Sequence, residues 1–305
     1  MRTAPERLLL RLEWRVLRRL DGRLQGSYRT VYQGSGTDFT GLRGYLPGDD
    51  ARHIDWNVTA RLAEPHLRVF TEDRELTVWL VLDRSASMEL GAPGRGKQDV
   101  LAELATVLAR LFSRGGNRVG ALLYDAVPDA RAPAGRKLTA RTVPPGTGRR
   151  HVLRIGAEIA RPVAARRGNT TDIAAMIEAV ARLARRRSLI IVISDFIGDG
   201  DWPQALQRLG RRHEVAALRI VDTTDDELPE AGLLVVEDAE TGEQVIIDSS
   251  DPLLRMRFRA AADERDARIA DGLRAAKVPA HRIDTTGDLA QALIEVVART
   301  QRRRA

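Results

Sequence analysis

The sequence predicts an α/β protein with a doubly wound, mostly parallel sheet and an irregular N-terminal extension. From residue 76 onward, short apolar runs alternate with helical stretches, and the apolar runs are almost uninterrupted. Strands of this kind are buried on both faces, as in parallel sheets that helices cover. Polar clusters follow several of the runs, where open sheets of this class bind their ligands.

We predict an N-terminal extension over 1–75 and the α/β domain over 76–305. Within the extension, residues 4–20 repeat apolar side chains at spacings of three and four with arginines between them, which indicates an amphipathic helix. Residues 21–50 are rich in glycine and polar residues and end in a turn at Pro47-Gly48. Two short strands are expected after them, over 54–60 and 65–71.

The α/β domain is divided by its apolar runs and by the helical pattern between them. The expected strands are 77–82, 118–124, 189–194, 214–221 and 281–285. The expected helices are 98–113, 151–166, 172–186, 202–212, 252–276 and 288–302. A hairpin insertion is predicted near 232–248, with Thr241-Gly242 at its turn.

Composition excludes several classes of site. The 305 residues contain no cysteine, which rules out disulfides, thiolate metal sites and cysteine nucleophiles. The five histidines are scattered and show no metal-ligand spacing. No apolar run of about 20 residues is present, so we expect no transmembrane helix and a cytoplasmic protein.

The chain is basic, with a formal net charge of +7 that comes almost entirely from arginine. Arginine clusters hold phosphates, and a basic amphipathic helix such as 4–20 can lie on an anionic membrane. Acidic residues are interspersed throughout, however, and no aromatic residues alternate with a basic stripe. Arginine-mediated binding of nucleic acid or a membrane surface is therefore an alternative rather than the leading hypothesis.

Three polar clusters lie at strand ends or helix starts. Asp83, Ser85 and Ser87 follow the strand at 77–82, the segment 168–172 precedes a helix, and Asp195 ends another strand. Each alone is an ordinary helix cap or turn. Together they offer the oxygen ligands that Mg²⁺ prefers, and their neutral hydroxyls leave the ion short of negative charge. This deficit favours a carboxylate supplied by a partner.

The segments LDRSASM, NTTDI and ISDF resemble the three parts of the metal-ion-dependent adhesion site of von Willebrand factor A domains. The resemblance implies a Rossmann-like von Willebrand factor A fold and a site for Mg²⁺, with Mn²⁺ or Ca²⁺ as alternatives. The implied ligands are Asp83, Ser85, Ser87, Thr171 and Asp195. Thr170 is the alternative to Thr171, and Phe196 stands where the usual third segment has glycine.

Residues 39–88 are similar to the signature of the bacterial "domain of unknown function 58" family. The match is carried by Tyr45, Pro47, Gly48, Asp49, Asp50, Ile54, Asp55, Trp56 and Arg61. It implies a MoxR-type AAA ATPase, or the client of one, as the protein partner in chaperone-like complex assembly. For the motif itself we expect a structural clasp: acids cap a turn and pair with arginines such as Arg52 or Arg61, and Trp56 is buried.

The leading functional hypothesis is a non-enzymatic, metal-dependent protein-binding module whose partner supplies a Glu or Asp carboxylate. The alternative is a phosphoryl-transfer enzyme with Asp83 as the nucleophile. Haloacid-dehalogenase-like phosphatases use a strand-end aspartate in this way, but they need a second acid two residues later as general acid, where this chain has Ser85. A receiver-type site needs a lysine after a later strand, and none of the three lysines follows a strand near this site.

Overall fold

A computed structural model describes residues 33–46, 49–71, 76–89, 94–125, 140–162, 171–198, 200–237, 243–289 and 291–293. The chain divides into two compact units, with the boundary between Glu75 and Leu76. The helix expected over 4–20 and most of the one expected over 288–302 lie outside the described residues. The two units are described separately below.

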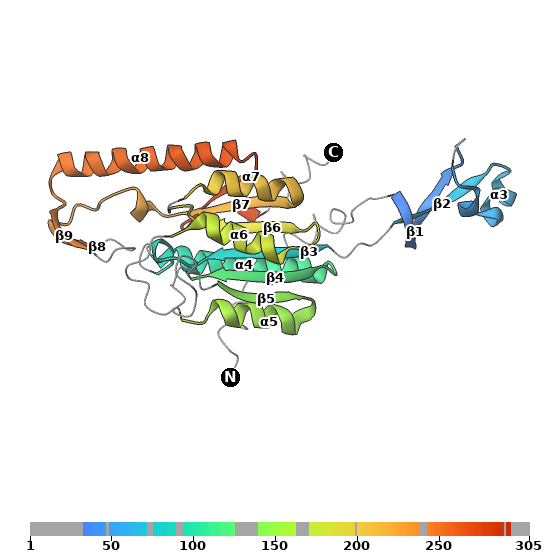
Figure 1. Ribbon diagram of the computed structural model, residues 1–305, viewed down its shortest axis with the longest axis horizontal. Helices are drawn as coiled ribbons and strands as arrows, with labels where there is room; N and C mark the ends of the chain where they lie inside the picture. The colour runs from blue at the N-terminus through green and yellow to red at the C-terminus, as the bar shows by residue number, and fades with distance from the viewer. Residues whose placement is uncertain are drawn as a thin grey trace. The chain divides into compact units, whose positions relative to one another are not determined.

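The larger unit is built on a six-stranded sheet with the order β10-β7-β6-β3-β4-β5 (Figure 1). All neighbouring strands are parallel except β4 and β5, which are antiparallel. The expected mostly parallel sheet is thus confirmed. The strands are β3 (Thr77–Asp83), β4 (Arg118–Tyr124), β5 (Ala140–Gly146), β6 (Leu189–Ser194), β7 (Glu214–Val221) and β10 (Ala280–Asp284).

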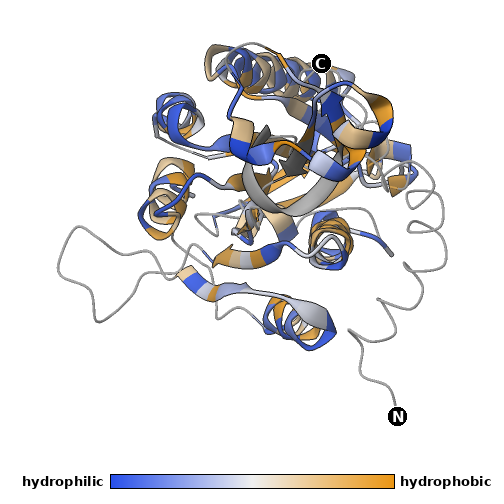
Figure 2. Ribbon diagram, turned by 90° about the vertical axis from the view of Figure 1, so that its right-hand side faces the viewer, coloured by the Kyte–Doolittle hydropathy of each residue, from blue (hydrophilic) through white to orange (hydrophobic). Residues whose placement is uncertain are grey.

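Helices cover both faces of this sheet (Figure 2). On one face, α6 (Ile173–Leu183), α7 (Trp202–Arg212) and α8 (Pro252–Ala275) bury apolar side chains against β3, β6 and β7. On the other face lie α4 (Lys97–Arg114) and α5 (Gly148–Ile159). Burial on both faces explains why the central strands read as unbroken apolar runs. The interior of β3, Val78–Leu82, is almost completely inaccessible to solvent.

Two elements of this unit differ from the sequence-based expectation, and the predicted hairpin is confirmed. Strand β5 was not predicted, because its sequence ARTVPPG contains two prolines; these are tolerated because β5 lies at an edge of the sheet. Helix α5 ends at Ile159 rather than 166, since Pro162 disfavours helical backbone in the residue before it. The hairpin near 232–248 is confirmed as β8 (Leu233–Glu237) paired with β9 (Gln244–Asp248).

The smaller unit contains β1 (Gln33–Gly44) and β2 (His66–Thr71), which pair antiparallel, and the helix α3 (Trp56–Leu62) between them. The strand expected over 65–71 is confirmed as β2. The strand expected over 54–60 is wrong, because the Asp55 carboxylate accepts hydrogen bonds from the backbone N–H groups of Asn57 and Val58 and starts a helix. The expected irregular segment 21–50 contains the long strand β1.

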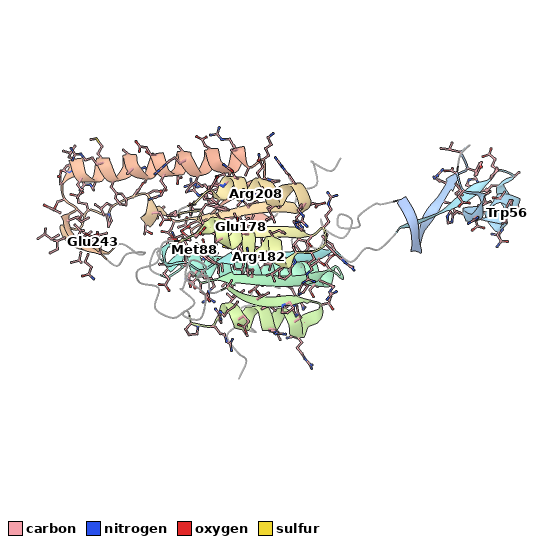
Figure 3. All side chains as sticks on the ribbon, viewed as in Figure 1. Trp56, Met88, Glu178, Arg182, Arg208 and Glu243 are labelled. Atoms are coloured by element: carbon pink, nitrogen blue, oxygen red, sulfur yellow. The ribbon has the colours of Figure 1, made fainter. Side chains whose placement is uncertain are left out.

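The expected clasp in this unit is correct for the acids and wrong for the tryptophan. Asp50 and Asp55 cap short helices, and Asp49 pairs with Arg43, with its Oδ1 2.6 Å from Arg43 Nη2. Arg43 is thus the partner of Asp49, where Arg52 or Arg61 was expected. Trp56, the first residue of α3, is 69% exposed (Figure 3), and none of the residues of this helix is buried.

Two helical glycines test how closely the helices pack. A Cβ on Gly272 of α8 would lie 2.7 Å from Cη2 of the buried Trp202, whereas a Cβ on Gly210 of α7 would have only Val278 at 3.7 Å. We expect Gly272→Ala to lower the free energy of unfolding by about 1–3 kcal/mol through overpacking. Gly210→Ala should raise it by up to about 1 kcal/mol, since alanine favours helix. Urea denaturation of both variants checks this, and equal stabilities would contradict it.

Candidate functional site

The site lies where the carboxyl ends of β3 and β6 meet. These strands are neighbours in the sheet although more than one hundred residues separate them, and Leu82 pairs with Ile193. The next residue on each strand is therefore also adjacent, and the Ser194 hydroxyl donates a hydrogen bond to Asp83 Oδ2 at 2.6 Å. Because β4 lies on one side of β3 and β6 on the other, this is a topological switch point of the sheet.

The loop after β3 holds its polar groups in a tight arrangement. The backbone N–H of Ser85 donates to Asp83 Oδ1 at 3.0 Å. The hydroxyl oxygens of Ser85 and Ser87 are 3.2 Å apart. Asp83, Ser85 and Met88, which follows Ser87, are all fully buried. The Asp-x-Ser-x-Ser spacing thus places one carboxylate and two hydroxyls in one small loop.

Of the second predicted segment, 168–172, the structure describes Thr171 and Asp172, and Thr171 is fully buried. Gly198, three residues after Asp195, approaches it so closely that a Cβ on Gly198 would lie 2.5 Å from the Thr171 carbonyl oxygen. The second and third segments are therefore in contact. Asp172 caps α6 through the N–H of Ala175, as the helix-cap alternative predicted. Thr170, the alternative ligand, lies outside the described residues.

Asp195 is oriented by both of its carboxylate oxygens. Oδ1 accepts a hydrogen bond from the N–H of Ile197 at 3.0 Å, and Oδ2 is 3.0 Å from the Lys97 ammonium nitrogen. Phe196 has a φ of +59°, in the left-handed region that favours glycine. Its ring is buried, with its centroid 5.1 Å from that of Trp202. Glycine adopts this conformation without strain, so the backbone here is one that suits the glycine of the motif that this segment resembles.

Lys97 and Asp225 belong to the site although the sequence pattern did not predict them. Lys97 is the first residue of α4 and is completely buried, and its Nζ is 2.9 Å from each carboxylate oxygen of Asp225. Lys97 lies at the start of a helix and not after a strand, so it does not match the lysine position of a receiver-type site. One signal was available: Lys97 is one of only three lysines in a chain whose basic residues are otherwise arginine.

The charges of the site are only partly compensated. Burial raises the pKa of Asp83 to about 6, and the nearby negative charge of Asp195 adds to this, while the hydrogen bond from Ser194 opposes it. Burial lowers the pKa of Lys97, but the attraction of Asp195 and Asp225 outweighs burial and raises that pKa overall. A cation beside Asp83 would therefore relieve a real electrostatic cost.

Arg84, inside the Asp-x-Ser-x-Ser loop, connects the loop to its surroundings. Its guanidinium donates to the backbone carbonyls of Glu158 and Arg161 at the end of α5, and its Nε is 3.6 Å from Asp125. The side chain is buried. Arg84 therefore anchors the loop to the C-terminal end of α5, through one carbonyl in its last turn and one just beyond it.

The donor set fits a hard cation. Asp83, Asp195 and the three hydroxyl-bearing residues Ser85, Ser87 and Thr171 supply only oxygen, which suits Mg²⁺ and excludes a soft-metal site. Among the described residues, no group of three or more His, Cys, Asp or Glu side chains is placed to hold a metal. That result concerns carboxylate, imidazole and thiolate clusters, whereas the predicted set relies mainly on hydroxyls.

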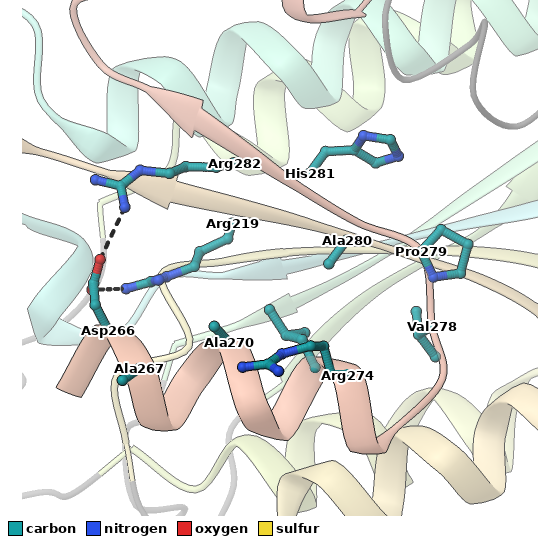
Figure 4. Close-up of a pocket in the computed structure, with 11 residues that line it drawn as sticks. Arg219, Asp266, Ala267, Ala270, Arg274, Val278, Pro279, Ala280, His281 and Arg282 are labelled. Carbon is teal, nitrogen blue, oxygen red and sulfur yellow. Dashed lines mark hydrogen bonds and ion pairs between the residues drawn. The ribbon is translucent and has the colours of Figure 1, made fainter. Parts of the chain in front are cut away.

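A cavity of about 660 Å³ lies apart from this cluster, between α8 and the edge strand β10. At its rim, Asp266 forms ion pairs with both Arg219 and Arg282 (Figure 4). Arg219 also donates from Nε to the backbone carbonyl of Asp195 at 3.3 Å. The cavity and the Asp195 segment thus share one arginine.

The buried Asp83 predicts a specific dependence of stability on pH. Its pKa of about 6 exceeds its ordinary value of 3.8, so between these values the folded protein keeps a proton that the unfolded chain releases. The stability from this group is complete below about pH 4 and is lost as pH rises through about 6. At about 1.4 kcal/mol per pKa unit, the loss is at most about 3 kcal/mol.

Unfolding experiments without divalent cations, on wild type and Asp83→Asn, check this dependence. The difference in unfolding free energy between the two proteins should change by this amount between about pH 4 and about pH 6. Parallel pH curves would contradict the raised pKa of the buried Asp83.

Comparisons with known proteins agree with the family resemblance. An uncharacterized protein of Mycobacterium tuberculosis is 38% identical over 292 residues, which cover 95% of this chain and 88% of that protein. An uncharacterized protein of Mycobacterium bovis matches to the same extent. One from Mycobacterium avium is 34% identical over 162 residues, 52% of this chain and 94% of its own.

Solved structures resemble the chain more distantly. The conserved hypothetical protein BatB of Bacteroides thetaiotaomicron covers 73% of this chain and 99% of its own, at 15% identity and a TM-score of 0.42. The pilus adhesin SpaC of Lactobacillus rhamnosus GG covers 75% of this chain and 30% of its own, at 11% identity and a TM-score of 0.45. At these scores the description of the fold rests on the strand order alone.

The family described as "Protein of unknown function DUF58" matches residues 41–268. This range includes the signature around Asp49 and Trp56 as well as the strands that carry Asp83 and Asp195. Together with the identity to the mycobacterial proteins over nearly the whole chain, the match shows that this protein belongs to the DUF58 family.

Proposed function

We propose that this chain is a non-enzymatic, metal-dependent protein-binding module of the von Willebrand factor A type. In this proposal Asp83, Ser85, Ser87, Thr171 and Asp195 hold Mg²⁺, with Mn²⁺ or Ca²⁺ as possible substitutes. These residues would leave one coordination position of the cation open, and a Glu or Asp carboxylate of the partner would fill it. The chain's own residues orient the ligands and bury them before any partner arrives.

The single observation that carries the proposal is the meeting of Asp83 with the Ser194-Asp195 segment at the switch point. Two buried carboxylates lie close enough for the charge of Asp195 to raise the pKa of Asp83. Lys97 compensates Asp195, but the pKa of Asp83 stays raised, and a buried acid of this kind is a candidate for binding a cation. The paired hydroxyls of Ser85 and Ser87 add neutral oxygens to the same loop.

The proposed partner is a MoxR-type AAA ATPase, or the client of one, met in the cytoplasm during chaperone-like assembly. This part rests on the family resemblance of residues 39–88. Within the described residues no helix is long and apolar enough to cross a membrane. A carboxylate on the ATPase or its client would then be the group that reaches the metal.

Phosphoryl transfer by Asp83 is the second candidate, and the presence of Lys97 in the cluster is the observation that favours it. Two features oppose it: Asp83 accepts hydrogen bonds on both oxygens, and it has no exposed surface. An assay with an aryl phosphate and Mg²⁺ separates the two functions. Hydrolysis that Asp83→Asn abolishes would replace the binding module by an enzyme.

The hydroxyl ligands give the first test of the metal site. We expect Ser85→Ala/Ser87→Ala to weaken Mg²⁺ or Mn²⁺ binding by more than about 100-fold, because loss of outer-shell partners alone costs about 10–100-fold. Isothermal titration calorimetry measures this directly. Ser250→Ala, an exposed serine on the loop after β9, is the matched control and should bind metal like wild type. Equal affinity in the double variant would remove the metal site.

The partner is tested with a purified MoxR-type ATPase from the same genome. The wild-type chain should bind it with Mg²⁺ and release it when EDTA is added, since the bridging cation is then removed. The Ser85→Ala/Ser87→Ala variant should not bind in either condition. Binding that is the same with Mg²⁺, with EDTA and in the variant would exclude a metal-bridged contact.

A further inference from the structure

We propose that the Lys97 ammonium serves as a built-in cation of the site. It pairs with the Asp195 carboxylate in the metal-free protein and competes with the divalent cation for that carboxylate. Lys97 would thereby determine how tightly the site binds metal. The inference rests on the proposed function of the same site, and its experiments separate the failure of the one from the failure of the other.

The first support is the position of the ammonium group. Lys97 has no exposed surface, and its Nζ lies 3.0 Å from Asp195 Oδ2 and 2.9 Å from both oxygens of Asp225. Lysine is almost never fully buried unless it is paired. A buried ammonium between two carboxylates does the electrostatic work of a bound cation, and one of these carboxylates is a predicted metal ligand.

The second support is that both ends of this contact are held in place. Lys97 begins α4, directly after Gly96, so its backbone is part of the first helical turn. Asp225 ends a short 3-10 helix (Thr223–Asp225) after β7, and Arg265 of α8 donates to its backbone carbonyl at 2.7 Å. The ammonium is therefore supplied by the fold itself and stays next to Asp195 without a metal.

The third support is the charge of the cluster. Lys97 pairs with the carboxylates of Asp195 and Asp225, and the positive charge of Arg265 also acts on Asp225. Asp83 adds a third carboxylate, close enough to Asp195 for their charges to repel. The cluster therefore keeps a net negative charge, which a divalent cation would offset. Arg219 does not change this balance, because its guanidinium contacts the backbone carbonyl of Asp195 and is itself paired with Asp266.

Two cations that share one carboxylate weaken each other's binding, because their charges repel at short range. Lys97 therefore makes the metal-free site stable and the metal site weaker than its carboxylates alone would make it. A site of this kind binds a divalent cation reversibly. Its affinity rises when a partner's carboxylate adds negative charge.

The decisive variant is Lys97→Met/Asp225→Asn. It removes one positive and one negative charge, so the net charge of the cluster is kept and only the competition for Asp195 is lost. We expect Mn²⁺ to bind at least about tenfold more tightly than in wild type, as measured by calorimetry or electron paramagnetic resonance. The matched control is Lys277→Met/Asp271→Asn at the end of α8, which should bind as wild type does.

The outcomes distinguish the two proposals. If wild type binds metal and the Lys97→Met/Asp225→Asn variant has the same affinity, the role of Lys97 is wrong and the metal site stands. If only the variant binds metal, Lys97 blocks the site in wild type and the inference holds. If neither protein binds Mg²⁺, Mn²⁺ or Ca²⁺, both proposals are overturned.

A measurement on the unaltered protein covers the case in which the variant does not fold. The chain has three lysines, so the side-chain nitrogen signals of ¹⁵N-lysine-labelled protein can be assigned one by one. The buried Lys97 ammonium should give a signal protected from exchange with water, and saturating Mg²⁺ should displace it. A Lys97 signal that does not move while Mg²⁺ binds would overturn the competition.

Discussion

The parallel pairing of β3 with β6 is the constraint on which the rest of the site depends. Leu82 lies beside Ile193, so the residues that end the two strands lie side by side at the carboxyl edge of the sheet. Asp83 and Ser194 then meet within hydrogen-bond distance, and Asp195 follows directly. The pairing is held by apolar burial on both faces, from α4 on one side and from α6 and α7 on the other. Hydrophobic burial therefore provides the free energy that keeps two acids out of water.

The cluster shows how a buried acidic site remains compatible with a stable fold. Asp83 accepts hydrogen bonds from Ser85 and Ser194, and Asp195 accepts one from Ile197 while it faces the Lys97 ammonium. The contacts of Asp83 lessen its desolvation penalty without removing it, because its pKa is still raised to about 6. A site that is partly compensated in this way would be assembled before the proposed cation or partner arrives. Preorganisation of this kind lowers the cost of binding.

The same edge of the sheet also connects the site to α8. Arg265 contacts the backbone of Asp225, and Arg219 contacts both Asp266 and the carbonyl of Asp195. A change in the position of α8 would therefore alter the contacts of the Asp195 and Asp225 backbones, and both of these acids face Lys97. The exposed apolar side chains of Leu233, Val235 and Ile246 lie on the hairpin that leads into this helix.

The sequence by itself determined the five parallel strands of the sheet, most of the helices and the family, because each leaves a pattern in consecutive residues. It did not predict β1 or β5, and it predicted a strand where α3 forms. Apolar runs such as 189–194 can only be buried strands in this context, and Asp-x-Ser-x-Ser is a local motif. The tertiary structure alone decided what depends on contacts between distant residues. It placed Lys97 against Asp195 and Asp225, added the edge strand β5 despite its prolines, and left Trp56 exposed. The physical reason is that periodicity records which face of an element is buried, but not which side chain from another element will meet it.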